Sequence, residues 1–367
     1  MPEGGGKGGK TLIMRNEHIL IMRFSALGDV AMLVPVVYSL ATQYPHLRVT
    51  VLSRAFARPL FEGLAPNVNF MDADFTKEHR GLMGLNALYR RLKAKHFTAV
   101  ADMHDVLRTK YLRMRFDFDR FHVAHVDKHR AGKKRLVNRK KKSLVQQATS
   151  FQNYADVLAR LGYPVQLEFR SLFPPHGGNL RVFGQSEFSE KKSFQQWIGI
   201  APFAAHPGKV YPLEKMEQVI GMLSAKHPNA RIFFFGAGER ERKCFEEWSK
   251  KYPRCVIASS VAKSLQEELV LMSHLDVMLS MDSANTHLAS AVDVPVVCVW
   301  GATHPYAGFM GWRQAEDTAV QLSLPCRPCS IFGDKPCYRG DLACMAGITP
   351  EMVVEKVELV LDHKNKR

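Results

Sequence analysis

The feature that most limits the fold of this chain is an alternation of short apolar runs with longer amphipathic runs. This alternation occurs in two separate series, one in each half of the chain. HILIMRF, RVTVLS and FTAVADM belong to the first series, and WIGIAPF, RIFFFGAG, LDVMLSM and VPVVCVW belong to the second. Short apolar strands separated by helical patterns predict parallel sheets that are covered on both faces. The sequence therefore predicts an α/β protein with two doubly wound parallel-sheet domains that face a central cleft.

A stretch rich in proline and glycine between the two series marks the expected domain boundary. We expect a flexible tail over residues 1–17, a first domain over 18–178 and a second domain over 179–350. A C-terminal helix over 351–367 and a basic insertion at about 108–142 complete the predicted organisation. Open parallel sheets bind ligands beyond the carboxyl ends of their strands, so the residues directly after each strand are the candidates for a functional site.

The charge of the chain favours anionic partners. It has 51 basic and 35 acidic residues, a formal net charge of +16, which suits nucleic acid, phosphorylated small molecules or an anionic membrane surface. Much of the excess lies between Arg108 and Lys142, in a run that is either a solvated loop or a contact with such a partner. The run lacks the aromatic interleaving of nucleic-acid-binding modules. No apolar stretch reaches the roughly 18 residues of a membrane helix, and we expect a cytoplasmic protein.

An acidic residue, Asp29, follows the first predicted strand, where a nucleotide-binding turn usually places glycines. It either caps the following helix, predicted over Val30 to Gln43, or acts as a general base for an acceptor hydroxyl group. Gly28 would permit close approach by a substrate or an unusual backbone angle. The strand that ends near Met103 carries polar side chains that are either structural or bind a hydroxylated, anionic acceptor. These are Asp102, His104, Asp105 and Arg108.

Polar side chains also follow the strands of the second half. Lys209 comes after the first of these strands and is either a surface lysine or a cation that neutralises a phosphate. FFFGAGERE contains a strand and a glycine-containing turn but lacks the full glycine pattern of a dinucleotide fingerprint, which argues against NAD binding. We expect Glu239 or Glu241 to accept hydrogen bonds from a ribose.

The segment LDVMLSMDSANTHLASAVDVPVVCVWGATHP, residues 275–305, combines a strand with a helix start. Asp282 and Ser283 are favoured N-cap residues. The N-terminus of such a helix leaves backbone N–H groups free for a pyrophosphate. A well-capped buried helix explains the aspartate and the alanines, but explains less easily why Asn285, Thr286 and His287 crowd its first turn.

The motifs RFSALGDV, KVYP and DSANTHLASAVDVPVVCVWGATHP resemble, in order and spacing, those of the bacterial lipopolysaccharide heptosyltransferases, glycosyltransferase family 9. The resemblance implies the GT-B fold, with the acceptor in the first of two Rossmann-like domains and the nucleotide sugar in the second. It implies inverting transfer of heptose from ADP-heptose to a lipopolysaccharide core or lipid-linked acceptor at the cytoplasmic membrane surface, without a cofactor or a tightly bound metal. Transfer from another nucleotide sugar and, in a different class, nucleic-acid binding remain alternatives.

The resemblance also implies roles for individual residues. It assigns the catalytic roles to Asp29, as the base, and to Lys209, which contacts the donor phosphates. The donor-binding residues that it implies are Asp282, Ser283, Ala284, Asn285, Thr286 and His287, with Glu239 added from the glycine-containing turn. The expected acceptor-binding residues are Ser25, Gly28, His104 and Arg108.

This chain departs from the family pattern at three places. Ala284 stands where glycine is usual, the pair Ala204–Ala205 stands where some members have hydroxyl-bearing side chains, and Tyr211 replaces a tryptophan. The acceptor region, with its long basic insertion, also matches the family pattern poorly. These departures bear on which sugar the donor carries, and still more on the acceptor, rather than on the class of reaction.

Four cysteines near the end of the chain follow the pattern C-x2-C-x7-C-x6-C. They are Cys326, Cys329, Cys337 and Cys344. A leading C-x2-C is compatible with a structural zinc site, whereas the irregular spacing favours reduced, partly buried thiols.

Overall fold

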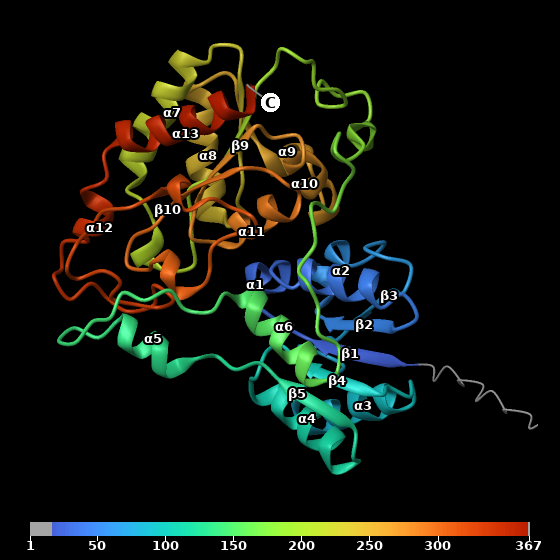
Figure 1. Cartoon of the computed structure of the whole chain (residues 1–367). Helices are drawn as coiled ribbons and strands as arrows, with labels where there is room; N and C mark the ends of the chain where they lie inside the picture. Colours follow the sequence, from blue (N-terminus) through green and yellow to red (C-terminus); the bar gives the residue numbers. More distant parts are fainter. Residues whose placement is uncertain (1–16, 366–367) are drawn as a thin grey trace, which may run out of the picture.

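The first half of the chain forms a five-stranded parallel sheet with the strand order β3-β2-β1-β4-β5 (Figure 1). The computed structural model describes residues 17–365, so the predicted tail lies outside the described residues except for Glu17. The strands are β1 (His18–Met22), β2 (Arg48–Ser53), β3 (Val68–Asp72), β4 (Ala99–Asp102) and β5 (His122–His125). All neighbouring strands run parallel, as the continuous apolar runs predict.

Helices cover both faces of this sheet. They are α1 (Leu27–Ala31), α2 (Val34–Gln43), α3 (Gly81–Lys93), α4 (Leu107–Phe118) and α6 (Ser150–Arg160), with the 3-10 helix η1 (Ala55–Leu60). Helix α5 (Arg130–Leu136) follows β5 and lies away from the sheet (Figure 1). The single helix predicted over Val30 to Gln43 is wrong, because α1 ends at Ala31 and α2 begins at Val34. Pro35 has no N–H group and fits only in a first helical turn, so it fixes the start of α2.

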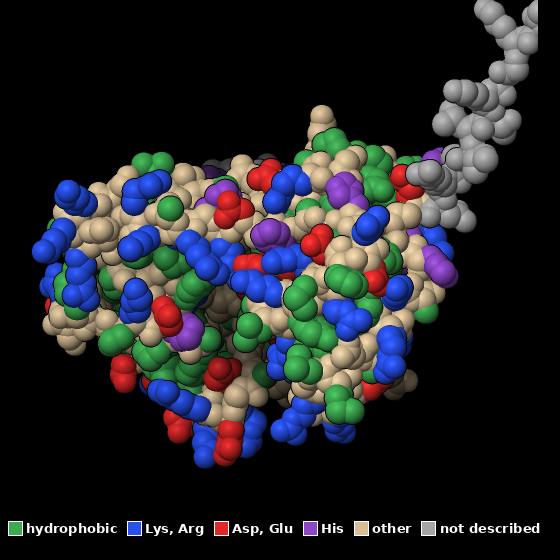
Figure 2. Space-filling view, turned by 90° about the horizontal axis from the view of Figure 1, so that it is seen from below, with side chains coloured by type: hydrophobic (Ala, Val, Ile, Leu, Met, Phe, Trp, Pro, Cys, Tyr) green, Lys and Arg blue, Asp and Glu red, His purple; other side chains and the backbone are tan. Residues whose placement is uncertain are grey.

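The basic run predicted as an insertion, residues 108–142, is largely part of the first sheet and its helices. It contains most of α4 and all of β5, and β5 pairs with β4 along its length. Only α5 and the loop after it extend toward the second half of the chain (Figure 1). Seen from below, Lys and Arg side chains are spread across this face of the molecule rather than gathered in one place (Figure 2).

The second half forms a six-stranded parallel sheet with the order β11-β10-β9-β6-β7-β8. Its strands are β6 (Trp197–Ala201), β7 (Arg231–Phe234), β8 (Cys255–Ile257), β9 (Val277–Met281), β10 (Val296–Val299) and β11 (Ala319–Val320). Its helices are α7 (Leu213–Lys226), α8 (Glu239–Lys251), α9 (Ala258–Val261), α10 (Leu265–Met272), α11 (Ala284–Ala291), α12 (Ala343–Ala346) and α13 (Pro350–Asn365), with the 3-10 helices η2 (Leu180–Phe183), η3 (Pro207–Lys209), η4 (Pro305–Ala307) and η5 (Glu316–Thr318). The predicted α/β fold with two doubly wound parallel sheets is confirmed.

The two halves meet where α1 packs against α11 (Figure 1). Buried side chains from both halves, such as Val30 and Leu288, belong to one apolar cluster. The chain passes from the first sheet to the second through the segment 161–196, which contains the predicted boundary at residue 178; the division into domains at that residue stays a prediction. Within residues 17–365, each helix is too short or too polar to cross a lipid bilayer.

Candidate functional site

Asp29 is the third residue of α1, just beyond the carboxyl end of β1. The N-cap residue is Ala26 rather than Asp29, but the Asp29 carboxylate does cap the helix, as the third helical residue of a capping box. Its Oδ2 accepts a hydrogen bond from the backbone N–H of Ala26 at 3.3 Å and forms an ion pair with Nη2 of Arg23 at 2.6 Å. Arg23 follows β1 directly and also donates to the carbonyl oxygen of Met103 after β4, which holds the guanidinium between two strand ends.

The surroundings of Asp29 keep its carboxylate ionised. Burial alone would raise the pKa of Asp29, but the charge of Arg23 and its hydrogen bond act in the opposite direction, as does nearby His287. The result is a pKa below the ordinary value of 3.8. Arg23 in turn lies 5.6 Å from the ring centre of Tyr154 on α6. The base candidate is therefore charged and fixed in place.

A cavity of about 710 Å³ opens on one side of Asp29. Ser25 and His104, both predicted on the acceptor side, line it, and their side chains approach to 3.4 Å between Oγ and Nε2. Burial lowers the pKa of His104 to about 4, with further lowering by Arg23 and Lys128, so this imidazole is neutral at pH 7 and suits hydrogen bonding rather than charge pairing.

The lining of this first cavity is strongly basic. Six cationic side chains face three carboxylates: Arg23, Lys128, Arg130, Lys133, Lys134 and Lys335 against Asp29, Asp127 and Asp334. Arg108, predicted to bind the acceptor, does not line the cavity; it is exposed and its guanidinium lies over the ring of Phe75 at 5.0 Å. The sequence identified the basic run but not which of its members face the cavity, because that depends on how α5 extends toward the second half, where Lys133 lies over the ring of Phe309.

A second cavity, of about 480 Å³, adjoins the first and shares Asp29 with it. Lys209, at the end of η3, and the start of α11 line this cavity. Of the predicted donor residues, those that line it are Asp282, Ser283, Ala284, Asn285 and His287. Thr286 points away, because its hydroxyl donates to the carbonyl oxygen of Met281 at 2.9 Å. Ser283 is the N-cap of α11, so the free N–H groups of the first turn lie at this cavity.

Lys209 and Asp282 are ion-paired rather than independent. Nζ of Lys209 lies 2.9 Å from Oδ2 of Asp282, and the hydroxyl of Thr303 donates to the same oxygen at 2.8 Å. Both charged side chains are largely buried. Both residues were expected at the donor, but their pairing was not foreseen because they lie on different strand ends.

Gly28 explains how closely the two halves approach at the site. A Cβ atom on Gly28 would lie 2.9 Å from Cδ2 of His287 and 3.1 Å from Cα of Ala284. The approach predicted for a substrate is therefore made by helix α11. The absence of a side chain at Gly28 lets α1 and α11 touch, which brings Asp29 beside the second cavity.

Of the two acids in the turn after β7, the structure places Glu241 rather than Glu239 at the second cavity. Glu239 is the first residue of α8 and pairs with Lys243 at 3.3 Å on the surface. The carboxylate of Glu241 accepts hydrogen bonds from the N–H groups of Ala237 and Gly238, at 2.8 and 3.2 Å.

Sequence reasoning missed one acid of the second cavity, Glu268 on α10. Burial raises its pKa to about 7 from the ordinary 4.5. Between pH 4.5 and about pH 7, the folded chain holds a proton that the unfolded chain has released. The free energy of unfolding therefore falls as the pH rises over this interval. The one sequence signal for a role of Glu268 was its position on an otherwise apolar face of α10.

Glu268→Gln is expected to raise the free energy of unfolding above pH 7 by about 1–3 kcal/mol and to change it little below pH 4.5. The amide resembles the protonated carboxyl group and has no charge to desolvate. Denaturant unfolding on both sides of this range measures the effect. Glu355→Gln, at an exposed position of α13, is the matched control; equal shifts in both variants would contradict the assignment.

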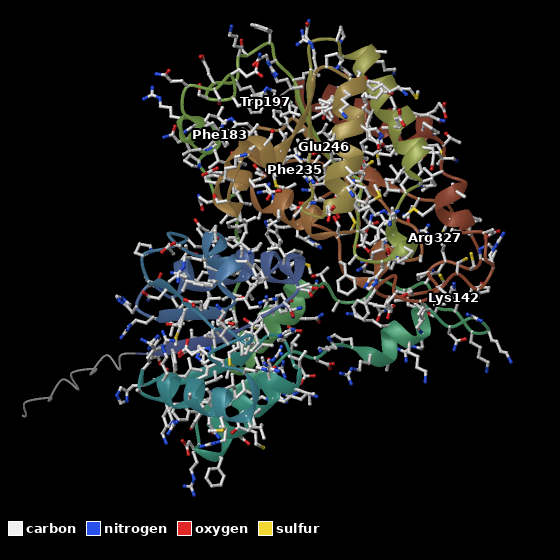
Figure 3. The ribbon with its side chains drawn as sticks, turned by 180° about the vertical axis from the view of Figure 1, so that it is seen from behind. Lys142, Phe183, Trp197, Phe235, Glu246 and Arg327 are labelled. Atoms are coloured by element: carbon white, nitrogen blue, oxygen red, sulfur yellow. The ribbon has the colours of Figure 1, made fainter. Side chains whose placement is uncertain are left out.

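The predicted zinc alternative for the four cysteines is not supported. Within residues 17–365 no three His, Cys, Asp or Glu side chains are grouped so that they could hold a metal ion, and the cysteines are free thiols. The loop that contains Cys326 and Cys329 instead supports the second cavity. Arg327 is buried and donates to the carbonyl oxygens of Gly301 and Thr303. Lys142 reaches this loop from the first half, with Nζ 3.0 Å from the carbonyl oxygen of Pro328 (Figure 3).

Comparison with known proteins agrees with this arrangement. The family model described as glycosyltransferase family 9 (heptosyltransferase) matches residues 85–335. The chain is 23% identical over 293 residues to the lipopolysaccharide core heptosyltransferase OpsX of Haemophilus influenzae, covering 79% of this chain and 80% of the relative. It is 22% identical over 311 residues to lipopolysaccharide heptosyltransferase 3 of Escherichia coli, covering 82% and 86%.

Solved structures show the same fold. A family 9 glycosyltransferase of Veillonella parvula has a TM-score of 0.70 at 19% identity, covering 95% of this chain and 98% of that one. The E. coli heptosyltransferase WaaC with ADP has a TM-score of 0.64 at 15% identity, covering 94% and 99%. The two Rossmann-like halves thus form the GT-B fold. From the family match over more than half of its length, this chain belongs to glycosyltransferase family 9, the heptosyltransferases.

Proposed function

We propose that this glycosyltransferase moves a heptose from ADP-heptose to a hydroxyl group of a lipopolysaccharide core or lipid-linked acceptor, with inversion at the sugar carbon. The observation that carries the proposal is the position of Asp29 between a basic cavity and a second cavity lined by Lys209 and the start of α11. The names of the curated relatives support the substrate class. Solved neighbours include WaaC with ADP and with ADP-2-deoxy-2-fluoro heptose.

The second cavity supplies what a departing diphosphate requires. In the proposed complex, the ADP phosphates lie at the N–H groups of Ser283 to Asn285 and near the ammonium group of Lys209. Negative charge grows on these phosphates as the bond to the sugar breaks, and fixed cationic and N–H groups stabilise it most in the transition state. Asp282 holds the ammonium group in place through the ion pair at 2.9 Å. Asp282 is also the proposed contact for the heptose hydroxyl groups.

Asp29 acts on the acceptor in this mechanism. The acceptor oxygen forms a bond to the anomeric carbon from the face opposite the diphosphate, and the hydroxyl proton passes to the Asp29 carboxylate. The bond between the anomeric carbon and the diphosphate oxygen breaks, and its electron pair leaves with ADP. Both recorded contacts of the Asp29 carboxylate within residues 17–365 use Oδ2, so Oδ1 is the proposed proton acceptor. Attack opposite the leaving group inverts the anomeric centre.

The basic lining of the first cavity supports an acidic acceptor. Six cations against three carboxylates favour a sugar that carries carboxylate or phosphate groups near the reacting hydroxyl. Such groups are typical of an acceptor built on an anionic lipid, which would place the enzyme at the cytoplasmic face of a membrane.

A donor screen tests the proposal. The protein is incubated with lipid acceptor from a heptose-deficient strain and either ADP-heptose or a set of UDP-sugars, and mass spectrometry follows the acceptor and the released nucleotide. We expect the acceptor to gain one heptosyl unit with release of ADP, and only with ADP-heptose. Transfer from a UDP-sugar instead would overturn the donor assignment while leaving the enzyme class in place.

A further inference from the structure

We propose that the outward face of α4 docks this protein on an anionic lipid bilayer. We call this face the α4 stripe and define it by Leu107, Met114 and Phe118. The inference rests on the proposed function in that a lipid-linked acceptor has to be reached at a membrane. It adds the surface that makes the contact, which neither the family match nor the catalytic site specifies.

The exposure of the α4 stripe is unusual for this protein. Leu107 and Phe118 are 87% and 84% exposed, and Met114 is 58% exposed. With Met83 on α3, also 87% exposed, Leu107 and Phe118 are the three most exposed large apolar side chains within residues 17–365. Scattered apolar side chains at a surface require no explanation, but a contiguous set marks an interaction site.

Helical spacing makes the set contiguous. Residues 107, 114 and 118 fall within an arc of about 40° at 3.6 residues per turn, and half-buried Tyr111 at its edge widens the arc to about 60°. The buried side chains of the same helix, Leu112 and Phe116, face the opposite direction and pack in the core. The helix therefore has two apolar faces, of which only the inner one is covered by the protein.

Basic side chains border the α4 stripe on both sides. The helix carries four basic residues and one acid, Arg108, Lys110, Arg113 and Arg115 against Asp117. By the same spacing, Arg108 and Arg115 flank one edge and half-exposed Lys110 flanks the other. Arg113 is turned inward, where it pairs with Asp102 and Asp105 at 3.0 and 3.3 Å. An apolar face bordered by cations is the arrangement by which a helix lies in the interface of an anionic bilayer.

The stripe begins at the acceptor cavity and lies on a helix that is joined to α3. Tyr111 donates to Oδ1 of Asn86 on α3 at 2.8 Å, and α3 also carries the exposed Met83. Val106, the residue before Leu107, lines the basic cavity. A bilayer on this face would thus hold the lipid part of an acceptor beside the cavity that receives its sugar.

The end of the basic run is less suited to this contact. The ammonium group of Lys142 is occupied by the carbonyl oxygen of Pro328 in the second half. Arg139 lies over the ring of Tyr338, at 4.0 Å from its centre. These contacts join the two halves of the protein, so we assign lipid binding to the α4 stripe rather than to residues 139–142.

Sedimentation with vesicles tests the inference. The vesicles contain phosphatidylglycerol and phosphatidylethanolamine, and phosphatidylcholine vesicles are the neutral comparison. We expect wild-type protein to bind the anionic vesicles, and Leu107→Ser/Met114→Ser/Phe118→Ser to lose about tenfold or more in affinity. Because these side chains are exposed, the variant should keep its circular dichroism spectrum and its turnover of a lipid-free acceptor sugar. Val182→Ser/Phe194→Ser, at exposed apolar positions outside the stripe, should bind vesicles like wild type.

Unchanged vesicle binding by the triple variant would overturn the docking surface. If, in addition, wild-type protein is a dimer in solution and the triple variant is a monomer, the stripe joins two copies of the chain instead. Failure of the proposed function would give a different result. The triple variant would still lose vesicle binding, but wild-type protein would transfer no heptose to any acceptor.

Discussion

Replacing Asp29 with asparagine is expected to lower kcat by about 10²–10⁴-fold while the affinity for ADP stays nearly unchanged. Asparagine keeps the size of the side chain, and its amide oxygen can still accept the hydrogen bond from Ala26. It cannot take a proton from the acceptor hydroxyl group. The proposed phosphate site, at Lys209 and the start of α11, is untouched by the change. Initial rates at saturating ADP-heptose and calorimetric titration with ADP measure the two quantities.

The control for this prediction is Asp156→Asn, which removes one carboxylate from an exposed position of α6 outside both cavities. It should keep wild-type kcat. Asp29→Asn also leaves Arg23 without its ionic partner, but Arg23 still donates to the carbonyl oxygen of Met103, so the turn should persist. Denaturant unfolding checks this. Full activity in a stable Asp29→Asn variant would remove Asp29 from the proposed mechanism.

The parts of the fold that could be predicted from the sequence are those with local signals. Buried parallel strands such as β1 and β9 are continuous apolar runs, and their alternation with helical patterns was sufficient for the two-sheet fold. The side chains after these strands were also predictable, because the carboxyl ends of parallel strands share one edge of the sheet. Asp29, Lys209 and Asp282 accordingly all line the second cavity. Their roles stay predictions until the variants are measured.

The misses follow from contacts between distant parts of the chain. Gly28 is required by Ala284 and His287 of the other half, and no local pattern around Gly28 contains that information. Arg108 and Glu239 carry suitable charges but lie on outward faces at helix starts, whereas Lys133 and Glu241 face the cavities. For Glu239 and Glu241, which both lie on α8, the rotation of about 100° per residue along the helix decides which carboxylate points inward. The break between α1 and α2 is different, since Pro35 was a local signal for it.

The second cavity depends on a set of connected groups rather than on single residues. Arg327 donates to the carbonyl oxygen of Thr303, Thr303 donates to Asp282, and Asp282 pairs with Lys209. The cysteine-containing loop and the donor site are therefore one unit.

Lys209→Met is expected to lower kcat by about 10²–10³-fold, the second large effect. Methionine fills a similar volume but supplies no charge where the departing ADP becomes negative. The change also leaves the Asp282 carboxylate buried with Thr303 as its hydrogen-bond donor. Breaking a buried pair in this way costs about 3–5 kcal/mol of stability. Lys226→Met, at the exposed end of α7, should change neither kcat nor stability.

The double variant Lys209→Met/Asp282→Asn separates the two effects of Lys209. Its amide carries no charge and can still accept the hydrogen bond from Thr303, so we expect most of the lost unfolding free energy to return. The rate should not return, because the cation near the phosphates is still missing. Recovery of kcat together with stability would show that Lys209 only neutralises Asp282, and the phosphate role would then pass to the N–H groups at the start of α11. If stability returns but activity does not, the lysine charge stabilises the negative charge that grows on ADP in the transition state.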